Sequence, residues 1–133
     1  MNLAEKVRNI PDFPIPGIQF KDITPLLLDP AAFAEIIRLL AERCEGRRVT
    51  RIAGIESRGF LFGAALAYHL GVGFAPIRKK GKLPAACIEE SYALEYGTAT
   101  IEMHKDALEP GDQVIVLDDL LATGGTLGAA CKL

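Results

Sequence analysis

Two adjacent carboxylates follow a short apolar run near the end of this chain. The run Val114–Leu117 is largely β-branched and lies between Gly111 and a Gly-rich turn, which predicts a strand buried on both faces. Asp118 and Asp119 come directly after it, so we expect them at the carboxyl end of the strand. Open α/β sheets bind their ligands at that edge.

The residues after the acidic pair are suited to holding a phosphate group. They offer unhindered backbone N–H groups, two hydroxyls and the start of a helix: Ala122, Thr123, Gly124, Gly125 and Thr126. Ionised carboxylates accept hydrogen bonds from the hydroxyls of a ribose and attract a hard cation such as magnesium. The pattern predicts a sugar-phosphate site, and the alternative is a plain turn beside a solvated acidic pair. The glycines fit neither the Walker A nor the dinucleotide-binding spacing.

This segment resembles the signature of type I phosphoribosyltransferases, which bind 5-phosphoribosyl 1-pyrophosphate (PRPP). Further stretches are similar to those of the adenine phosphoribosyltransferase family and keep that family's order. They are PDFPIPGIQFKDI at 11–23, GIESRGFLFG at 54–63, RKKGKLP at 78–84 and YALEYG at 92–97. Several motifs in one order are more specific than any one of them.

The resemblance implies an α/β fold of the type I phosphoribosyltransferase kind. Its central, mainly parallel sheet would be flanked by helices and joined to a small N-terminal hood. We expect one domain over residues 1–133, with the hood at about 1–30, the core at about 31–133 and a flexible loop at about 80–97. Family members continue beyond the position of Leu133, so the C-terminal elements of that fold are expected to be missing here.

Local patterns predict the elements themselves. Asp29 reads as the N-cap of a helix that starts at Pro30, buries Phe33, Ile36, Ile37 and Leu40, and stops at Gly46. A second helix is predicted over 60–70, closed by Gly71, and a short one over residues 3–10 that Pro11 ends. Strands are predicted at 49–55, 72–77 and 98–103. The alternation of strands and helices predicts a parallel sheet.

The resemblance also implies which residues bind the pyrophosphate of PRPP. Ser57 and Arg58 would lie in a loop at a strand end, where the Arg58 guanidinium can bind two phosphate oxygens. In the family, the Glu56–Ser57 bond is expected to be cis. Arg78 and Lys82 belong to a basic run before a stretch, 84–90, without period, which suggests a mobile loop that closes over PRPP and excludes water. A solvated charge run is the alternative, most of all for Lys80.

The base site and the catalytic group are carried over from the same family. Phe20 is expected to stack on adenine, with backbone groups of Gln19 and Lys21 reading its edge. A Phe in a proline-rich segment is equally often part of a core. Glu95 is the candidate general acid/base for the proton of the base, and Tyr96 would help to cover PRPP.

Composition limits the partners and the setting. The formal net charge is -2 with both signs interspersed, which argues against nucleic acid and anionic membranes and favours a small ligand. Three cysteines without Cys-x-x-Cys spacing indicate neither disulfides nor zinc and suit a reducing cytoplasm. No stretch is long and apolar enough for a signal peptide or membrane span, so a soluble protein is expected.

The expected reaction is adenine plus PRPP giving AMP and pyrophosphate, a step of purine salvage. Magnesium would be held mainly through PRPP and pyrophosphate, with no protein metal site predicted, and a homodimer is implied by the resemblance alone. The alternatives are a phosphoribosyltransferase for another purine, or a catalytically silent isoform that binds PRPP or AMP or only dimerises.

Overall fold

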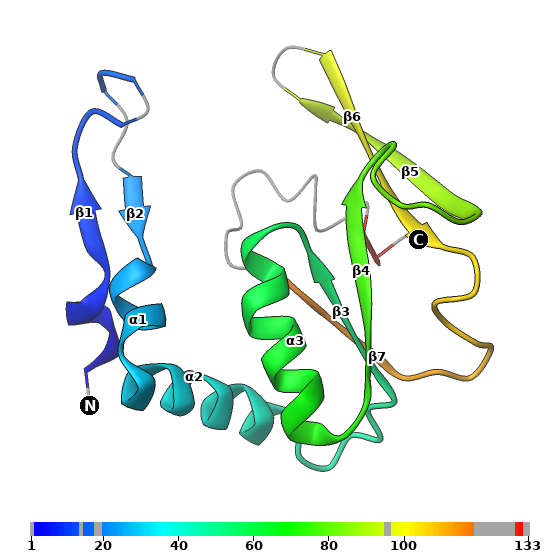
Figure 1. Cartoon of the computed structure of the whole chain (residues 1–133), viewed down its shortest axis with the longest axis horizontal. Coiled ribbons are helices and arrows are strands. Elements are labelled where there is room, and N and C mark those ends of the chain that lie inside the picture. The colour runs from blue at the N-terminus through cyan, green and yellow to red at the C-terminus, as the bar shows by residue number, and fades with distance from the viewer. Residues whose placement is uncertain (1, 14, 18–19, 95–96, 119–129, 132–133) are drawn as a thin grey trace. The chain divides into compact units, whose positions relative to one another are not determined.

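The computed structural model describes residues 2–13, 15–17, 20–94, 97–118 and 130–131 (Figure 1). The chain divides into two compact units, Met1–Arg43 and Cys44–Leu133. The boundary between the units comes after Arg43, and the predicted limits of hood and core stay a prediction. Within the described part of the chain, no helix has the length and apolar character needed to cross a membrane.

The first unit opens with a short 3₁₀ helix, η1 (Leu3–Lys6), followed by strand β1 (Arg8–Ile10). β1 pairs antiparallel with β2 (Phe20–Asp22), so that Asn9 lies opposite Lys21. The prediction of one helix over residues 3–10 is therefore wrong after Lys6. The apolar spacing fits a helix locally, but pairing with β2 decides the conformation.

Helices α1 (Thr24–Leu28) and α2 (Pro30–Arg43) complete the first unit. Asp29 caps α2 as predicted, because its Oδ1 accepts the N–H groups of Ala31 at 3.0 Å and Ala32 at 3.2 Å. A hydrogen bond from Lys6, together with the Ala32 N–H, lowers the pKa of Asp29. Of the predicted buried stripe, Ile37 is buried, and the other members are half-buried: Phe33, Ile36 and Leu40. The short helix α1 was not predicted.

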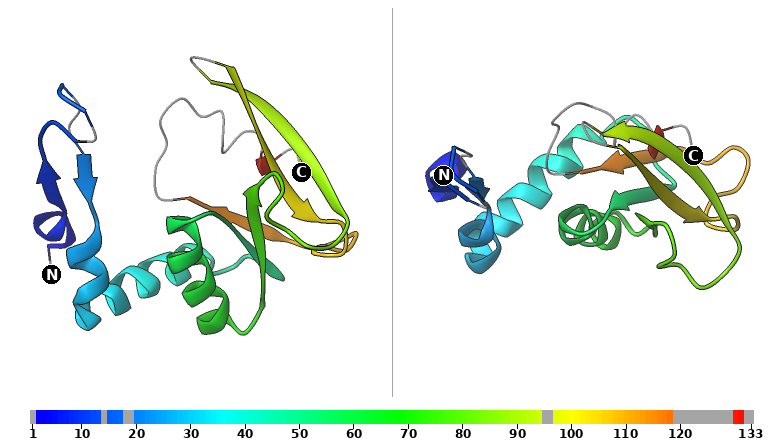
Figure 2. Two further views of the ribbon diagram at one scale, coloured as in Figure 1. Left: turned by 45° about the horizontal axis from the view of Figure 1, so that its top comes forward. Right: turned by 90° about the horizontal axis from the view of Figure 1, so that it is seen from above.

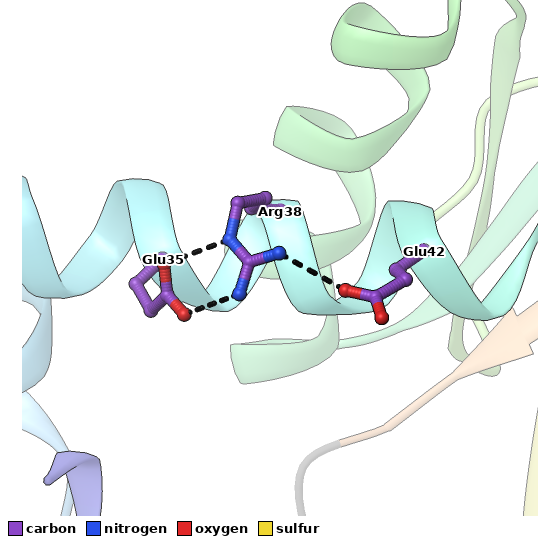
Figure 3. Close-up of polar contacts among 3 residues, drawn as sticks. All are labelled: Glu35, Arg38 and Glu42. Atoms are coloured by element: carbon purple, nitrogen blue, oxygen red, sulfur yellow. Dashed lines mark hydrogen bonds and ion pairs between the residues drawn. The ribbon is translucent and has the colours of Figure 1, made fainter. Parts of the chain in front are cut away.

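The exposed side of α2 carries a three-residue charge network (Figure 3). The Arg38 guanidinium contacts both carboxylate oxygens of Glu35, at 2.9 and 2.6 Å, and one oxygen of Glu42 at 3.0 Å. The hydrogen bond from Arg38 lowers the pKa of Glu35. These spacings of three and four residues stabilise the helix itself.

A five-stranded mixed sheet forms the centre of the second unit. Its strands are β3 (Arg51–Ile55), β4 (Gly73–Lys79), β5 (Cys87–Leu94), β6 (Gly97–His104) and β7 (Val114–Leu117), in the order β5-β6-β4-β3-β7. β7, β3 and β4 are parallel, as predicted, whereas β6 is antiparallel to β4 and to β5. β7 is half-buried rather than buried on both faces.

Helix α3 (Arg58–Leu70) covers one face of β3, β4 and β7 (Figure 1). It ends at Gly71, whose φ of 73° is left-handed, as the predicted helix stop requires. Gly54 faces α3, so its neighbours Ala53 and Ile55 point to the opposite face of the sheet. That face holds the core cluster of Ala53, Ile55, Ala75, Ile77, Ile101, Met103 and Ala130.

The segment 84–94 differs most from expectation. The sequence predicts an irregular loop at 84–90, but residues from Cys87 onward form β5, which pairs with β6 along its whole length, from Cys87 opposite His104 to Leu94 opposite Gly97. The hairpin of β5 and β6 projects past the carboxyl end of β4 (Figure 1, Figure 2). Its pairing is specified by β6 rather than by any period within 84–90. That this hairpin acts as a lid stays a prediction.

Candidate functional site

The two predicted phosphate-binding segments start at the same edge of the sheet. β3 and β7 are adjacent and parallel, with Gly54 opposite Leu117. The chain after β3, which begins with Glu56, therefore leaves the sheet beside Asp118, which follows β7. Asp118 is half-buried. The other predicted residues of this segment lie outside the described residues: Asp119, Ala122, Thr123, Gly124, Gly125 and Thr126.

Glycines allow this close approach. A Cβ added to Gly59, in the first turn of α3, would lie 2.8 Å from the carbonyl oxygen of Leu117. A Cβ on Gly54 would lie 2.7 Å from the Gly59 carbonyl oxygen and 2.8 Å from the Phe74 ring. Real Cβ atoms do not approach other atoms so closely, so the helix start can sit against the two strand ends only with glycine at both positions.

The loop after β3 contains the predicted pyrophosphate ligands. The bond between Glu56 and Ser57 is cis, which confirms the expectation drawn from the resemblance. Ser57 is exposed and Arg58 begins α3. The Phe60 ring packs edge-on against Phe74 at a centroid distance of 5.7 Å.

Glu56 is the centre of the polar contacts at this edge. Its Oε1 accepts the backbone N–H of Lys79 at 2.6 Å, and its Oε2 accepts from Lys82 Nζ at 2.8 Å. Arg78 Nε lies 3.6 Å from Oε1. The Glu56 side chain is only 9% exposed, so the two hydrogen bonds and the Arg78 charge balance a carboxylate that water hardly reaches.

The pKa of Glu56 is lowered from its ordinary value of 4.5. Burial by itself would raise this pKa, since it disfavours the charged form. The hydrogen bonds from Lys82 and from the Lys79 N–H, with the charges of Lys82 and Arg78, outweigh that effect. The carboxylate is therefore ionised at neutral pH.

Arg78 retains an unused donor. The Arg78 guanidinium carbon lies 5.8 Å from the centre of the Phe60 ring, in a cation–π arrangement. Among the described residues, its buried Nε has no hydrogen-bond partner, because 3.6 Å to Glu56 is too long for a hydrogen bond. A buried donor of this kind can be satisfied by a water molecule or by an acceptor atom of a ligand.

The basic run turns sharply after β4. Gly81 has a φ of 93° and donates its N–H to Glu102 Oε1 on β6 at 2.7 Å. The Lys80 N–H donates to the Thr100 carbonyl at 3.0 Å. The Lys80 side chain points to a different partner, exposed Glu89, at 3.3 Å. Within this run, Arg78 and Lys82 thus share Glu56, whereas Lys80 forms a surface ion pair.

The remaining predicted residues lie in the first unit or outside the described residues. Phe20 and Lys21 belong to β2 in the first unit, where Lys21 is exposed. Gln19, Glu95 and Tyr96 lie outside the described residues. Their roles stay predictions.

Sequence reasoning assigned no role to Glu56 or Glu102. Glu56 belongs to the motif at 54–63 and directly follows a predicted strand, just as Asp118 directly follows β7. This position at a strand end could have indicated Glu56 as a residue of the site. Glu102 lies within the predicted strand 98–103, and only its pairing opposite Arg78 reveals its contact with the basic run.

Comparison with known proteins identifies the family. Residues 24–133 match the model of the phosphoribosyl transferase domain. An adenine phosphoribosyltransferase of Roseiflexus sp. (strain RS-1) is 65% identical over 132 residues, which cover 99% of this chain and 77% of that protein. This chain belongs to the adenine phosphoribosyltransferase family. Members of this family are transferases of purine salvage, and the resemblance seen in the sequence is confirmed.

Solved structures of adenine phosphoribosyltransferases share the fold. The enzyme of Thermoanaerobacter pseudethanolicus superposes with a TM-score of 0.94 at 57% identity, covering 98% of this chain and 76% of that one. The Saccharomyces cerevisiae enzyme, solved with adenine and an imino-altritol bisphosphate, gives a TM-score of 0.92 at 43% identity and covers 98% and 77% of the two chains. The predicted α/β fold of the type I phosphoribosyltransferases is thus confirmed.

Proposed function

We propose that this chain transfers the 5-phosphoribosyl group of PRPP to N9 of adenine, releasing AMP and pyrophosphate. Membership of the adenine phosphoribosyltransferase family supports the reaction, and the relative from Saccharomyces cerevisiae was crystallised with adenine. The observation that carries the site assignment is the buried Arg78 Nε, which has no hydrogen-bond partner among the described residues and lies beside Lys82 and the adjoining ends of β3 and β7.

In this proposal each part of PRPP has its own group of residues. Pyrophosphate lies against the Ser57 hydroxyl and the basic residues Arg58, Arg78 and Lys82, with Tyr96 covering it. The ribose hydroxyls donate to the carboxylates of Asp118 and Asp119. The 5′-phosphate accepts from the backbone N–H groups at 122–126. Adenine stacks on Phe20, with Gln19 and Lys21 at its edge.

The chemistry is a substitution at the anomeric carbon. The bond from that carbon to the pyrophosphate oxygen breaks, and the electron pair leaves with pyrophosphate. The adenine N9 lone pair forms the new bond, and N9 loses its proton. The sugar is cationic in the transition state, so a carboxylate nearby stabilises it, and we assign this role and the proton transfer to Glu95.

Magnesium is proposed to enter the site bound to the phosphates of PRPP. Of the two carboxylates that are predicted to bind the ribose, Asp118 lies within the described residues. When bound, magnesium would offset the charge of the departing pyrophosphate.

The proposed setting is the cytoplasm and the proposed assembly a homodimer. Cys44, Cys87 and Cys131 are free thiols, which fits a reducing compartment. Dimerisation rests on the family resemblance. Light scattering on the purified chain gives the molar mass directly, and a monomer at assay concentration would contradict it.

The deciding experiment is AMP formation from adenine and PRPP by the purified 133-residue chain, with its length confirmed by intact mass. Adenine, guanine and hypoxanthine are supplied in turn, and pyrophosphate release is measured. Of the three purines, we expect only adenine to cause release of pyrophosphate. If another purine is preferred, that purine and not adenine is the substrate. If the chain binds PRPP but releases no pyrophosphate, it is a catalytically silent binding protein.

A further inference from the structure

Glu56 and Lys82 differ in how firmly each is held. The Glu56 carboxylate is 9% exposed, and its Oε1 is fixed by the Lys79 backbone N–H at 2.6 Å. The Lys82 side chain is 46% exposed, and its one polar contact among the described residues is the 2.8 Å pair with Glu56 Oε2. The carboxylate is therefore a fixed acceptor, and the ammonium is the partner that can leave.

The turn that carries Lys82 is held independently of this ion pair. The Gly81 N–H donates to Glu102 at 2.7 Å and the Lys80 N–H to the Thr100 carbonyl at 3.0 Å. Release of the Lys82 ammonium from Glu56 thus leaves the backbone of the turn in place. Only the side chain has to move.

Glu56 and a bound phosphate ligand compete for the single positive charge of Lys82. Arg78 and Lys82 supply the positive charge for a phosphate ligand in the proposed function, yet both face the ionised Glu56. An anionic ligand must compete with this carboxylate for Lys82, and its charges are also repelled by the carboxylate that remains.

We propose that Glu56 is a positioning residue that holds the Lys82 ammonium in the ligand-free protein and yields it to the pyrophosphate group when that group binds. Glu56 takes Lys82 back as pyrophosphate leaves. The carboxylate thus keeps the cation ordered and weakens the hold on the product. This inference rests on the proposed function, which places pyrophosphate at Arg78 and Lys82.

The substitution Glu56→Gln separates charge from shape. The glutamine carbonyl oxygen still accepts the Lys79 N–H, but the negative charge that competes for Lys82 is gone. We expect magnesium-free pyrophosphate to bind about 10-fold more tightly, as judged from the repulsion between like charges a few ångströms apart in a partly buried site. General damage to the site would weaken binding, which is the opposite direction.

Glu89→Gln is the matched control. Glu89 also pairs with a lysine of the basic run, Lys80, at 3.3 Å, but both side chains are exposed, and among the described residues neither forms an ion pair with Arg78 or Lys82. The affinity of the Glu89→Gln protein for pyrophosphate should stay within about 2-fold of that of the wild type. Isothermal titration of all three proteins with pyrophosphate measures these constants. A folded Glu56→Gln protein whose affinity is unchanged or weaker overturns the proposal.

A second measurement needs no variant. In crystals of the ligand-free wild-type chain, Lys82 Nζ should contact Glu56 Oε2, and in crystals soaked with pyrophosphate it should contact a phosphate oxygen and lie more than about 4 Å from the carboxylate, beyond ion-pair distance. If the Lys82–Glu56 ion pair persists in the pyrophosphate complex, the role proposed for Glu56 is wrong, and the proposed pyrophosphate site still stands. Failure of the wild-type chain to bind pyrophosphate overturns the proposed site as well.

Discussion

The carbonyl oxygen of Leu117 lies 2.8 Å from the position that a Cβ of residue 59 would occupy. The first turn of α3 therefore lies directly against the end of β7. This places the predicted pyrophosphate loop, at 56–58, beside the start of the acidic segment at Asp118. The absence of a side chain at Gly59 is therefore a condition for bringing the two phosphate-binding segments together.

Gly59→Ala should destabilise the chain by about 1–3 kcal/mol, because the added methyl group meets backbone that is fixed by the β3–β7 pairing and cannot rotate away. It should also weaken PRPP binding, since relief of the clash separates the two loops. Urea unfolding and titration with magnesium-PRPP measure the two effects. Ala64→Ser, at an exposed position of the same helix, should change stability by less than about 0.5 kcal/mol. Equal stability of the two variants would contradict the argument.

Asp118→Asn combined with Asp119→Asn should weaken PRPP binding without unfolding the chain. Asp118 lies at the end of β7 and outside the buried core cluster. A ligand at a hundred times its dissociation constant stabilises a folded protein by about 2.7 kcal/mol, so magnesium-PRPP should clearly raise the melting temperature of the wild type. The rise should be small in the double variant. If it is undiminished, the carboxylates do not bind the ribose.

Glu95→Gln should lower kcat by about 10²- to 10⁴-fold and change PRPP affinity little, because proton transfer acts in the transition state. Steady-state kinetics with adenine as the varied substrate separates kcat from KM. Glu90→Gln, on the paired strand β5, serves as the comparison and should retain nearly full activity. The catalytic assignment fails if both variants lose activity equally.

Asp112 should make stability depend on pH in the acid range. Its Oδ2 accepts the Glu109 N–H at 2.7 Å and its Oδ1 the Thr50 hydroxyl at 2.8 Å, and these bonds lower its pKa from the ordinary 3.8. A folded pKa below the unfolded one stabilises the protein above the unfolded value, and this stabilisation is lost as the pH falls through the folded pKa.

Asp112→Asn should therefore unfold at lower urea concentration than wild type at pH 7, and the two midpoints should approach each other below pH 4. Urea titrations at pH 7, 5 and 3.5 give the midpoints. The substitution Asp106→Asn removes an exposed carboxylate of the same stretch and should leave the midpoint at pH 7 unchanged. A gap between wild type and Asp112→Asn that grows toward low pH would refute the assignment.

The sequence by itself determined the features that depend on neighbouring residues. Asp29 and Pro30 start α2, Gly71 ends α3, and Val114–Leu117 is a strand followed by Asp118, all as predicted. Each of these depends on contacts within a few residues: a cap, a left-handed turn, or an apolar run between turns. Four motifs in family order also sufficed to predict the family and its fold.

Only the tertiary structure decided which conformation won where local signals were weak or wrong. Residues 8–10 look helical but form β1, and 84–90 show no period although β5 begins at Cys87, because each segment pairs with another strand, β2 or β6. The role of Glu56 is of the same kind. Its contacts with Lys79 and Lys82 bridge residues that are far apart in sequence, and they exist because β3 and β4 run parallel with Ile55 opposite Ile77. A register between strands that are distant in sequence depends on which faces both strands bury in the sheet, so it is not determined by either strand alone.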